Sequence, residues 1–84
     1  MDDDTTISHR HALGRALHEM RNRAGLTQKE LAARSGTDDT YISRVEHGRI
    51  DVGWTTLLRL LTALDADLGD LAVEVEGRDS RRKR

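Results

Sequence analysis

The most constraining feature of this sequence is a pair of short helical segments with clear start and stop signals. Thr27 and Glu30 have the spacing of a capping box, in which each side chain accepts a hydrogen bond from the other residue's backbone N–H. Gly36 suits the left-handed conformation that ends a helix, so the first segment is short. Asp38 is a favourable N-cap for a second short helix that ends at Gly48. The pattern therefore predicts two short helices joined by a tight turn.

A longer amphipathic helix precedes this pair, and an apolar helix follows it. Before Gly25, apolar residues recur at helical spacing, namely Leu13, Leu17, Met20 and Ala24. Residues 54–64 place their leucines on a surface wider than one core-facing stripe. The chain has 84 residues and no cysteine, so it forms one small domain held together by packing. We therefore expect an all-α fold of four to five short helices with a central helix-turn-helix.

The two ends of the chain differ from this helical middle. Residues 1–6 are polar and acidic and are expected to be disordered, so the helix-turn-helix domain spans residues 7–71. In residues 72–84, apolar and acidic side chains alternate with the period of a strand, at Val73, Glu74, Val75 and Glu76. Because the chain offers no second strand, this short β-strand would pair with its copy across a dimer, with a basic tail after it. The alternative is a frayed tail.

Charge is distributed unevenly along the chain, although the formal net charge is only −1. Residues 5–50 carry a net charge of +3, whereas residues 51–77 carry −5. A basic half suits a phosphate-bearing partner such as nucleic acid, and the acidic half then faces elsewhere. The chain has no apolar run long enough to cross a bilayer, and its start is acidic, unlike a signal peptide. We expect a cytoplasmic protein without membrane contact.

Metal binding and catalysis are not expected. His9 and His11 are two residues apart on a helix and His18 lies two turns further, so these histidines do not converge on one ion. The sequence shows no Ser-His-Asp spacing and no phosphate-cradling glycine loop, and so small a core leaves little room for a water-excluding cleft. We therefore expect a protein that is not an enzyme and uses no cofactor.

One stretch of the chain resembles the Xre/Cro family of lambda-repressor-like DNA-binding domains: residues 25–48, GLTQKELAARSGTDDTYISRVEHG. The Thr-Gln opening, the Glu-Leu-Ala of the first short helix and the glycine of the turn fall in register with that family, as do the Ile-Ser and Glu-x-Gly of the second. Weaker similarity extends the match to residues 12–71. The resemblance implies that the second short helix enters the major groove of double-stranded DNA.

The resemblance also implies which residues contact DNA. The candidate base readers lie on the outward face of the second short helix and are Asp39, Thr40, Ser43 and Arg44. The candidate phosphate contacts are Gln28, Tyr41, His47 and Arg49. Arg44 is the favoured base reader, because its guanidinium can donate two hydrogen bonds to guanine. Arg21 and Glu46 match positions that form an ion pair between helices in the family.

Asp39 departs from the expected pattern. A carboxylate near DNA phosphates is repelled, unless it accepts a hydrogen bond from the N4 amino group of cytosine. This residue therefore argues against tight non-specific DNA binding.

Three functions fit these features. The leading interpretation is a transcription regulator, a homodimeric repressor that reads a pseudo-palindromic operator. The second is an antitoxin, whose acidic second half would bind a toxin protein while its helix-turn-helix regulates its own operon. The third is an adaptor that keeps the fold but binds only protein, which Asp38 and Asp39 would favour.

Overall fold

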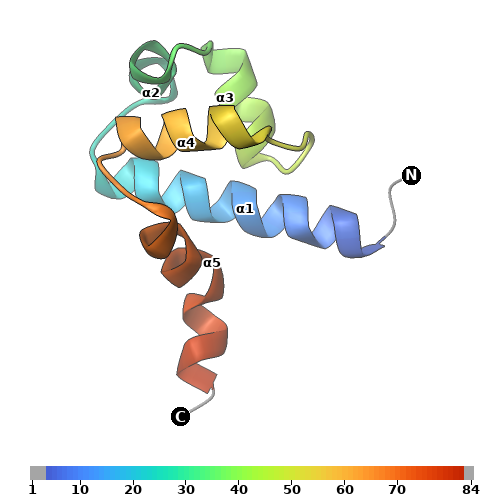
Figure 1. Ribbon diagram of the computed structural model, residues 1–84. Helices are drawn as coiled ribbons and strands as arrows, with labels where there is room; N and C mark the ends of the chain where they lie inside the picture. Colours follow the sequence, from blue (N-terminus) through green and yellow to red (C-terminus); the bar gives the residue numbers. More distant parts are fainter. Residues whose placement is uncertain (1–3, 83–84) are drawn as a thin grey trace.

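The computed structural model describes residues 4–82, and this part of the chain is all-α (Figure 1). It contains five helices and no strand: α1 (Asp4–Arg23), α2 (Gln28–Ser35), α3 (Asp39–Glu46), α4 (Trp54–Ala63) and α5 (Leu68–Arg82). None of these helices combines the length and the apolar character needed to cross a membrane. The predicted all-α fold is confirmed, and α2 and α3 are the predicted pair of short helices.

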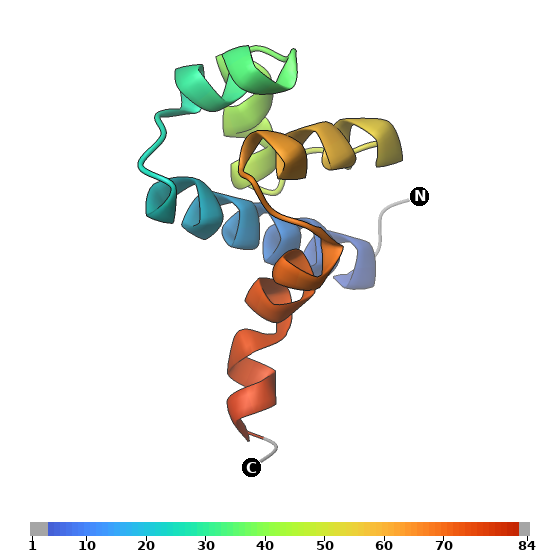
Figure 2. The same cartoon turned by 60° about the vertical axis from the view of Figure 1, so that its left-hand side comes forward.

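The longest helix, α1, supports the others. Both α3 and α5 pack against α1, while α2 packs against α3 and α4. As a result, α2 and α3 lie together on one side of α1 and α5 lies on the other, as both ribbon views show (Figures 1 and 2). The far half of α5 extends away from the remaining helices in both views.

The core lies where α1, α2, α3 and α4 meet, and Leu71 of α5 joins it. Its most deeply buried side chains are Leu17, Leu31, Ile42, Leu60 and Leu61. Fully burying an aliphatic side chain of this size contributes about 1.5–3 kcal/mol. Because the four helices share one apolar cluster, their relative positions are coupled through it.

The unit formed by α2, the turn and α3 has the capping interactions that the sequence predicts. The Thr27 hydroxyl accepts a hydrogen bond from the Glu30 backbone N–H at 3.0 Å, and the Glu30 carboxylate accepts one from the Thr27 N–H at 2.8 Å. The Asp38 carboxylate accepts a hydrogen bond from the Tyr41 N–H at 2.8 Å. Between the helices, Gly36 has a φ of 74°, which disfavours any residue with a Cβ. These local interactions fix where α2 ends and where α3 begins.

The predicted strand after residue 71 is wrong, because residues 72–76 belong to α5. The helix starts with a second capping box, in which Asp67 and Asp70 accept hydrogen bonds from each other's backbone N–H at 2.8 and 2.9 Å. Ala66 and Leu71 flank this box and join the core, in the positions of a hydrophobic staple. A helix satisfies its own backbone groups, whereas a single strand leaves them unpaired. The capping box therefore favours a helix more strongly than the alternating valines favour a strand.

An ion pair between Arg23 of α1 and Glu74 of α5 attaches α5 to α1. Leu71, one turn earlier on α5, is buried in the core. The first half of α5 is therefore held by α1, while its second half extends beyond it (Figure 2).

The N-terminal prediction also needs correction. Disorder is wrong for residues 4–6, because α1 begins at Asp4. A carboxylate in the first turn of a helix is stabilised by the helix dipole. The rest of that prediction, residues 1–3, lies outside the described residues, as do residues 83–84 of the predicted basic tail.

Gly14 of α1 sets how closely α1 approaches the end of α3. A Cβ at this position would lie 2.8 Å from the carbonyl oxygen of Glu46 and still closer to that of Val45. We predict that Gly14→Ala lowers the free energy of unfolding by about 1–3 kcal/mol, because overpacking against backbone outweighs the gain in helix propensity. Urea unfolding measures this change. The control is Gly53→Ala, where a Cβ meets nothing within 4 Å. A Gly14→Ala variant more stable than the wild type would contradict the argument.

Candidate nucleic-acid interface

The outer face of α3 presents the side chains that the sequence predicts as base readers. Asp39, Thr40 and Arg44 are exposed, and Ser43 is half-buried. On the opposite side of the same helix, Ile42 and Val45 are buried in the core. The helix therefore separates a packed side from a polar side that is open to a partner.

The four candidate phosphate contacts occupy different environments. His47 and Arg49 are exposed, whereas Gln28 and Tyr41 are half-buried. His47 donates a hydrogen bond from Nδ1 to the Ser43 carbonyl oxygen at 2.7 Å, which leaves its Nε2 for another partner. Contacts of these residues with DNA stay predictions.

Tyr41 packs against the protein's own core. Burial raises the pKa of the Tyr41 hydroxyl, against the opposing effect of the nearby Thr56 side chain of α4. Tyr41 is therefore partly a core residue.

Glu46, at the end of α3, is the centre of a polar cluster that joins three helices. Its side chain is only 4% exposed and that of Arg21 is 9% exposed. Arg21 donates to Glu46 from Nε at 2.6 Å and from Nη2 at 3.0 Å, and it also donates from Nη1 to the Leu26 carbonyl oxygen at 2.8 Å. Gln28, the first residue of α2, donates from Nε2 to Glu46 at 3.0 Å. The ion pair implied by the family resemblance is present, and Gln28 is bound to it.

His18 of α1 completes this cluster. Its Nδ1 lies 2.9 Å from Glu46 Oε1, and its Nε2 lies 3.0 Å from the side-chain nitrogen of Asn22. In the neutral form, Nδ1–H donates to Glu46 and Nε2 accepts from Asn22, which satisfies both ring nitrogens. The role of His18 in this cluster is not predicted from the sequence. Its position three residues before Arg21 on the same helix face is the signal that could have done so.

The hydrogen bonds of the cluster determine the protonation of its members. Burial alone would raise the pKa of the Glu46 carboxyl, but the hydrogen bonds from Arg21, His18 and Gln28 outweigh it and lower this pKa. The hydrogen bond to Glu46 raises the pKa of the Arg21 guanidinium, although burial opposes this. The cluster therefore contains an ionised pair at neutral pH.

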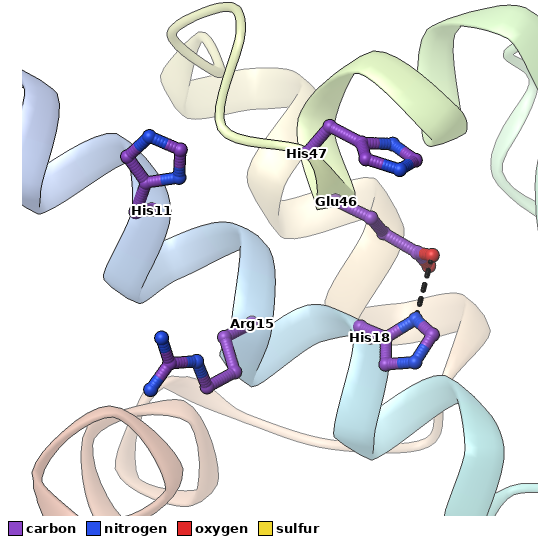
Figure 3. Close-up of a pocket in the computed structure, with 5 residues that line it drawn as sticks. All are labelled: His11, Arg15, His18, Glu46 and His47. Atoms are coloured by element: carbon purple, nitrogen blue, oxygen red, sulfur yellow. Dashed lines mark hydrogen bonds and ion pairs between the residues drawn. The ribbon is translucent and has the colours of Figure 1, made fainter.

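A pocket beside this cluster is lined by His11, Arg15, His18, Glu46 and His47 (Figure 3). His11 and Arg15 stand on one side of it, and His18, Glu46 and His47 on the other. Although three imidazoles line the same pocket, the side chains that the structure describes, those of residues 4–77, include no group of three or more potential ligands arranged to hold a metal ion.

Known proteins are similar to this chain in both sequence and fold. The profile of a family described as "Helix-turn-helix domain" matches residues 12–74. An uncharacterized HTH-type transcriptional regulator, y4dJ of Sinorhizobium fredii, is 40% identical over 55 residues, which cover 66% of this chain and 71% of that protein.

Solved structures of two bacterial regulators superpose well on this fold. The clp gene regulator ClgR from C. glutamicum has a TM-score of 0.77 and 38% identity, covering 81% of this chain and 87% of that chain. The restriction-modification controller protein C.AhdI from Aeromonas hydrophila has a TM-score of 0.74 and 38% identity, covering 76% of this chain and 97% of that chain.

A helix-turn-helix whose second helix exposes a polar face, in a chain similar to these regulators, defines a DNA-binding transcription regulator. The chain belongs to the helix-turn-helix domain family. Its resemblance to the Xre/Cro group is confirmed by the same matches.

We predict that Glu46→Gln lowers the free energy of unfolding at neutral pH by about 3 kcal/mol or more, because it leaves the buried Arg21 without its counter-charge. A carboxyl with a lowered pKa in the folded state stabilises the fold above its ordinary value of 4.5, and this stabilisation is lost as the pH falls through the folded value. The stability of the variant should therefore fall less steeply below pH 4.5.

Denaturant unfolding from neutral to acid pH measures both effects. The matched control is Asp51→Asn, because the Asp51 carboxylate is exposed and pairs with Arg10 at 3.0 Å. An exposed pair contributes little, so this control should stay close to the wild type. Equal losses in the two variants would refute the special role of Glu46.

Proposed function

We propose that this chain is a homodimeric repressor, without catalytic activity, that inserts α3 into the major groove of a pseudo-palindromic operator. The observation that carries this proposal is the polar outer face of α3, held in place by the Glu46 cluster at its end. Because the relatives are bacterial regulators, the proposed place of action is the cytoplasm, where bacterial DNA lies.

Arg44 is the proposed reader of guanine. Its side chain is exposed in the last turn of α3, on the side opposite the core. A guanidinium can donate two hydrogen bonds to the O6 and N7 atoms of guanine, which contributes about 1–3 kcal/mol of discrimination. Asp39, in the first turn, can accept a hydrogen bond from cytosine N4, and Thr40 and Ser43 complete the reading face.

Gln28, His47 and Arg49 are the proposed contacts to the sugar-phosphate backbone around α3, with Tyr41 as a further contact. Gln28 is held by Glu46 through one amide N–H, so its other N–H can donate to a phosphate oxygen without a new rotamer. Such contacts fix the position of the protein on DNA and carry no base information.

A stripe of apolar residues on α5 is the proposed dimer contact. Leu68, Ala72 and Val75 are exposed and recur at a spacing of four and three residues, which places them on one flank of the helix. The second half of α5 extends away from the other helices, and an isolated helix of this length is marginally stable in water. Pairing of this stripe with its copy would stabilise the helix and relate two α3 helices by a two-fold axis.

We predict that Arg44→Ala weakens binding to the specific operator by about 1–3 kcal/mol and relaxes the preference at one base position, whereas Gln28→Ala weakens binding to all sequences alike. Fluorescence anisotropy with operator and random duplexes at one salt concentration measures both. Arg59→Ala, an exposed charge change on α4, is the control.

Equal losses of Arg44→Ala on operator and random DNA would remove its role as a base reader. If the wild type binds no duplex DNA at all, the repressor proposal fails and the protein-binding adaptor is favoured instead.

We predict that Val75→Glu raises the dimer dissociation constant by about tenfold or more, because the new carboxylate would lie unpaired in an apolar contact. Val73→Glu is the matched control, since Val73 lies on another side of α5 and is 71% exposed. Light scattering at micromolar concentration distinguishes the two variants. A dimer broken by Val73→Glu and not by Val75→Glu would exclude the stripe as the interface.

A further inference from the structure

The pocket between α1 and the end of α3 gathers three of the four histidines of the chain, together with Arg15 (Figure 3). Two of these imidazoles, His11 and His18, come from α1, and the third, His47, directly follows α3. The fourth histidine, His9, is exposed on α1 and does not line the pocket. The fold therefore brings together side chains that are far apart in the sequence.

The side chains that line this pocket include Arg15, which is positively charged, and histidines, which become positively charged on protonation. Its single carboxylate, Glu46, accepts two hydrogen bonds from Arg21 and is thereby neutralised. The nearest acidic residue on the loop after α3, Asp51, is engaged by Arg10 at 3.0 Å. Arg15 carries a permanent positive charge, and histidine is the side chain that changes its charge between about pH 5 and 8. Anions are therefore favoured in the pocket as the pH falls.

Two of the imidazoles, those of His11 and His47, can also donate hydrogen bonds to an anion. His47 uses Nδ1 to bind the Ser43 carbonyl, so a protonated His47 has its Nε2–H for another acceptor. His11 is exposed beside Gly48, since a Cβ on that glycine would meet the His11 ring at 2.6 Å.

Both ring nitrogens of His18 are engaged, Nδ1 by Glu46 at 2.9 Å and Nε2 by the Asn22 amide at 3.0 Å, and Arg21 Nη2 lies 3.2 Å from the same Nδ1. His18, whose side chain is 45% exposed, therefore contributes charge to the pocket and no further hydrogen bond. Each ring is thus positioned by the protein and still reachable from solvent.

The pocket adjoins the outer face of α3, because His47 lies three residues beyond Arg44, about one helical turn. We propose that this pocket binds a phosphate of the DNA backbone when α3 is docked, and that protonation of its histidines strengthens this contact. The proposal rests on the docking of α3 in the major groove and adds a site on α1 to it. The residues it adds to the DNA contacts are His11, Arg15 and His18.

The consequence is proton uptake on DNA binding. If the complex holds more protons than the free protein, DNA affinity must rise as the pH falls, by thermodynamic linkage. With three histidines lining the pocket, we expect the wild type to bind its DNA roughly three- to tenfold more tightly at about pH 5.5 than at about pH 8. The variant His11→Gln/His18→Gln/His47→Gln should show a change below about twofold over the same range.

The experiment measures duplex affinity by anisotropy over this pH range at one salt concentration. Calorimetry in two buffers of different ionisation enthalpy gives the number of protons taken up on binding. His9→Gln is the matched control, because it removes an exposed histidine of the same helix outside the pocket. Arg15→Gln should weaken binding at every pH. It should also lower the number of counterions released on DNA binding, given by the salt dependence of the affinity, by about one.

Circular dichroism melting of each variant shows that it is folded at the pH of measurement. A triple variant that keeps the pH dependence and proton uptake of the wild type would overturn the phosphate site, as would a His9→Gln variant that loses them to the same extent. In either case DNA would still bind, so the proposed function would stand. Failure of the wild type to bind DNA at any pH would overturn the proposed function itself.

Discussion

The buried pair of Glu46 and Arg21 is the interaction on which the arrangement of α1, α2 and α3 depends. Removing two such charges from water costs several kcal/mol each, so the pair is stable only when its hydrogen bonds are complete. Here they are complete, because His18, Gln28 and the Leu26 carbonyl supply or accept the remaining bonds. The cluster forms only in one geometry of the three helices. The proposed reading face of α3 is therefore set before any DNA arrives, which would reduce the entropy lost on binding.

Much of the fold could be predicted from the sequence because its signals act over a few residues. The capping residues Thr27, Glu30 and Asp38 and the turn at Gly36 all take the roles that their local pattern predicts. Helical spacing also identified the buried faces, such as Leu17 of α1 and Ile42 of α3. These features depend on backbone hydrogen bonds between near neighbours, which the order of residues determines directly.

The remaining features depend on contacts that the sequence does not show. Val73 and Val75 have the alternation of a strand, yet the capping box at Asp67 and the burial of Leu71 place them on a helix. The proposed base-reading and phosphate-binding roles come from the family resemblance, and nothing in local patterning distinguishes Arg44 from another exposed arginine. The contribution of His18 depends on Glu46, which lies 28 residues away, and became visible only in the folded chain.

The position of α5 has a consequence for the length of DNA between two half-sites. This helix packs against α1, and the Arg23–Glu74 ion pair joins the two near the point where α5 leaves the domain. In a dimer that pairs through α5, the angle between α1 and α5 sets the distance between the two recognition helices. Half-sites separated by one turn of DNA require about 34 Å. Loosening the Arg23–Glu74 contact would then broaden the range of operator spacings that the protein accepts, while each half-site would be read as before.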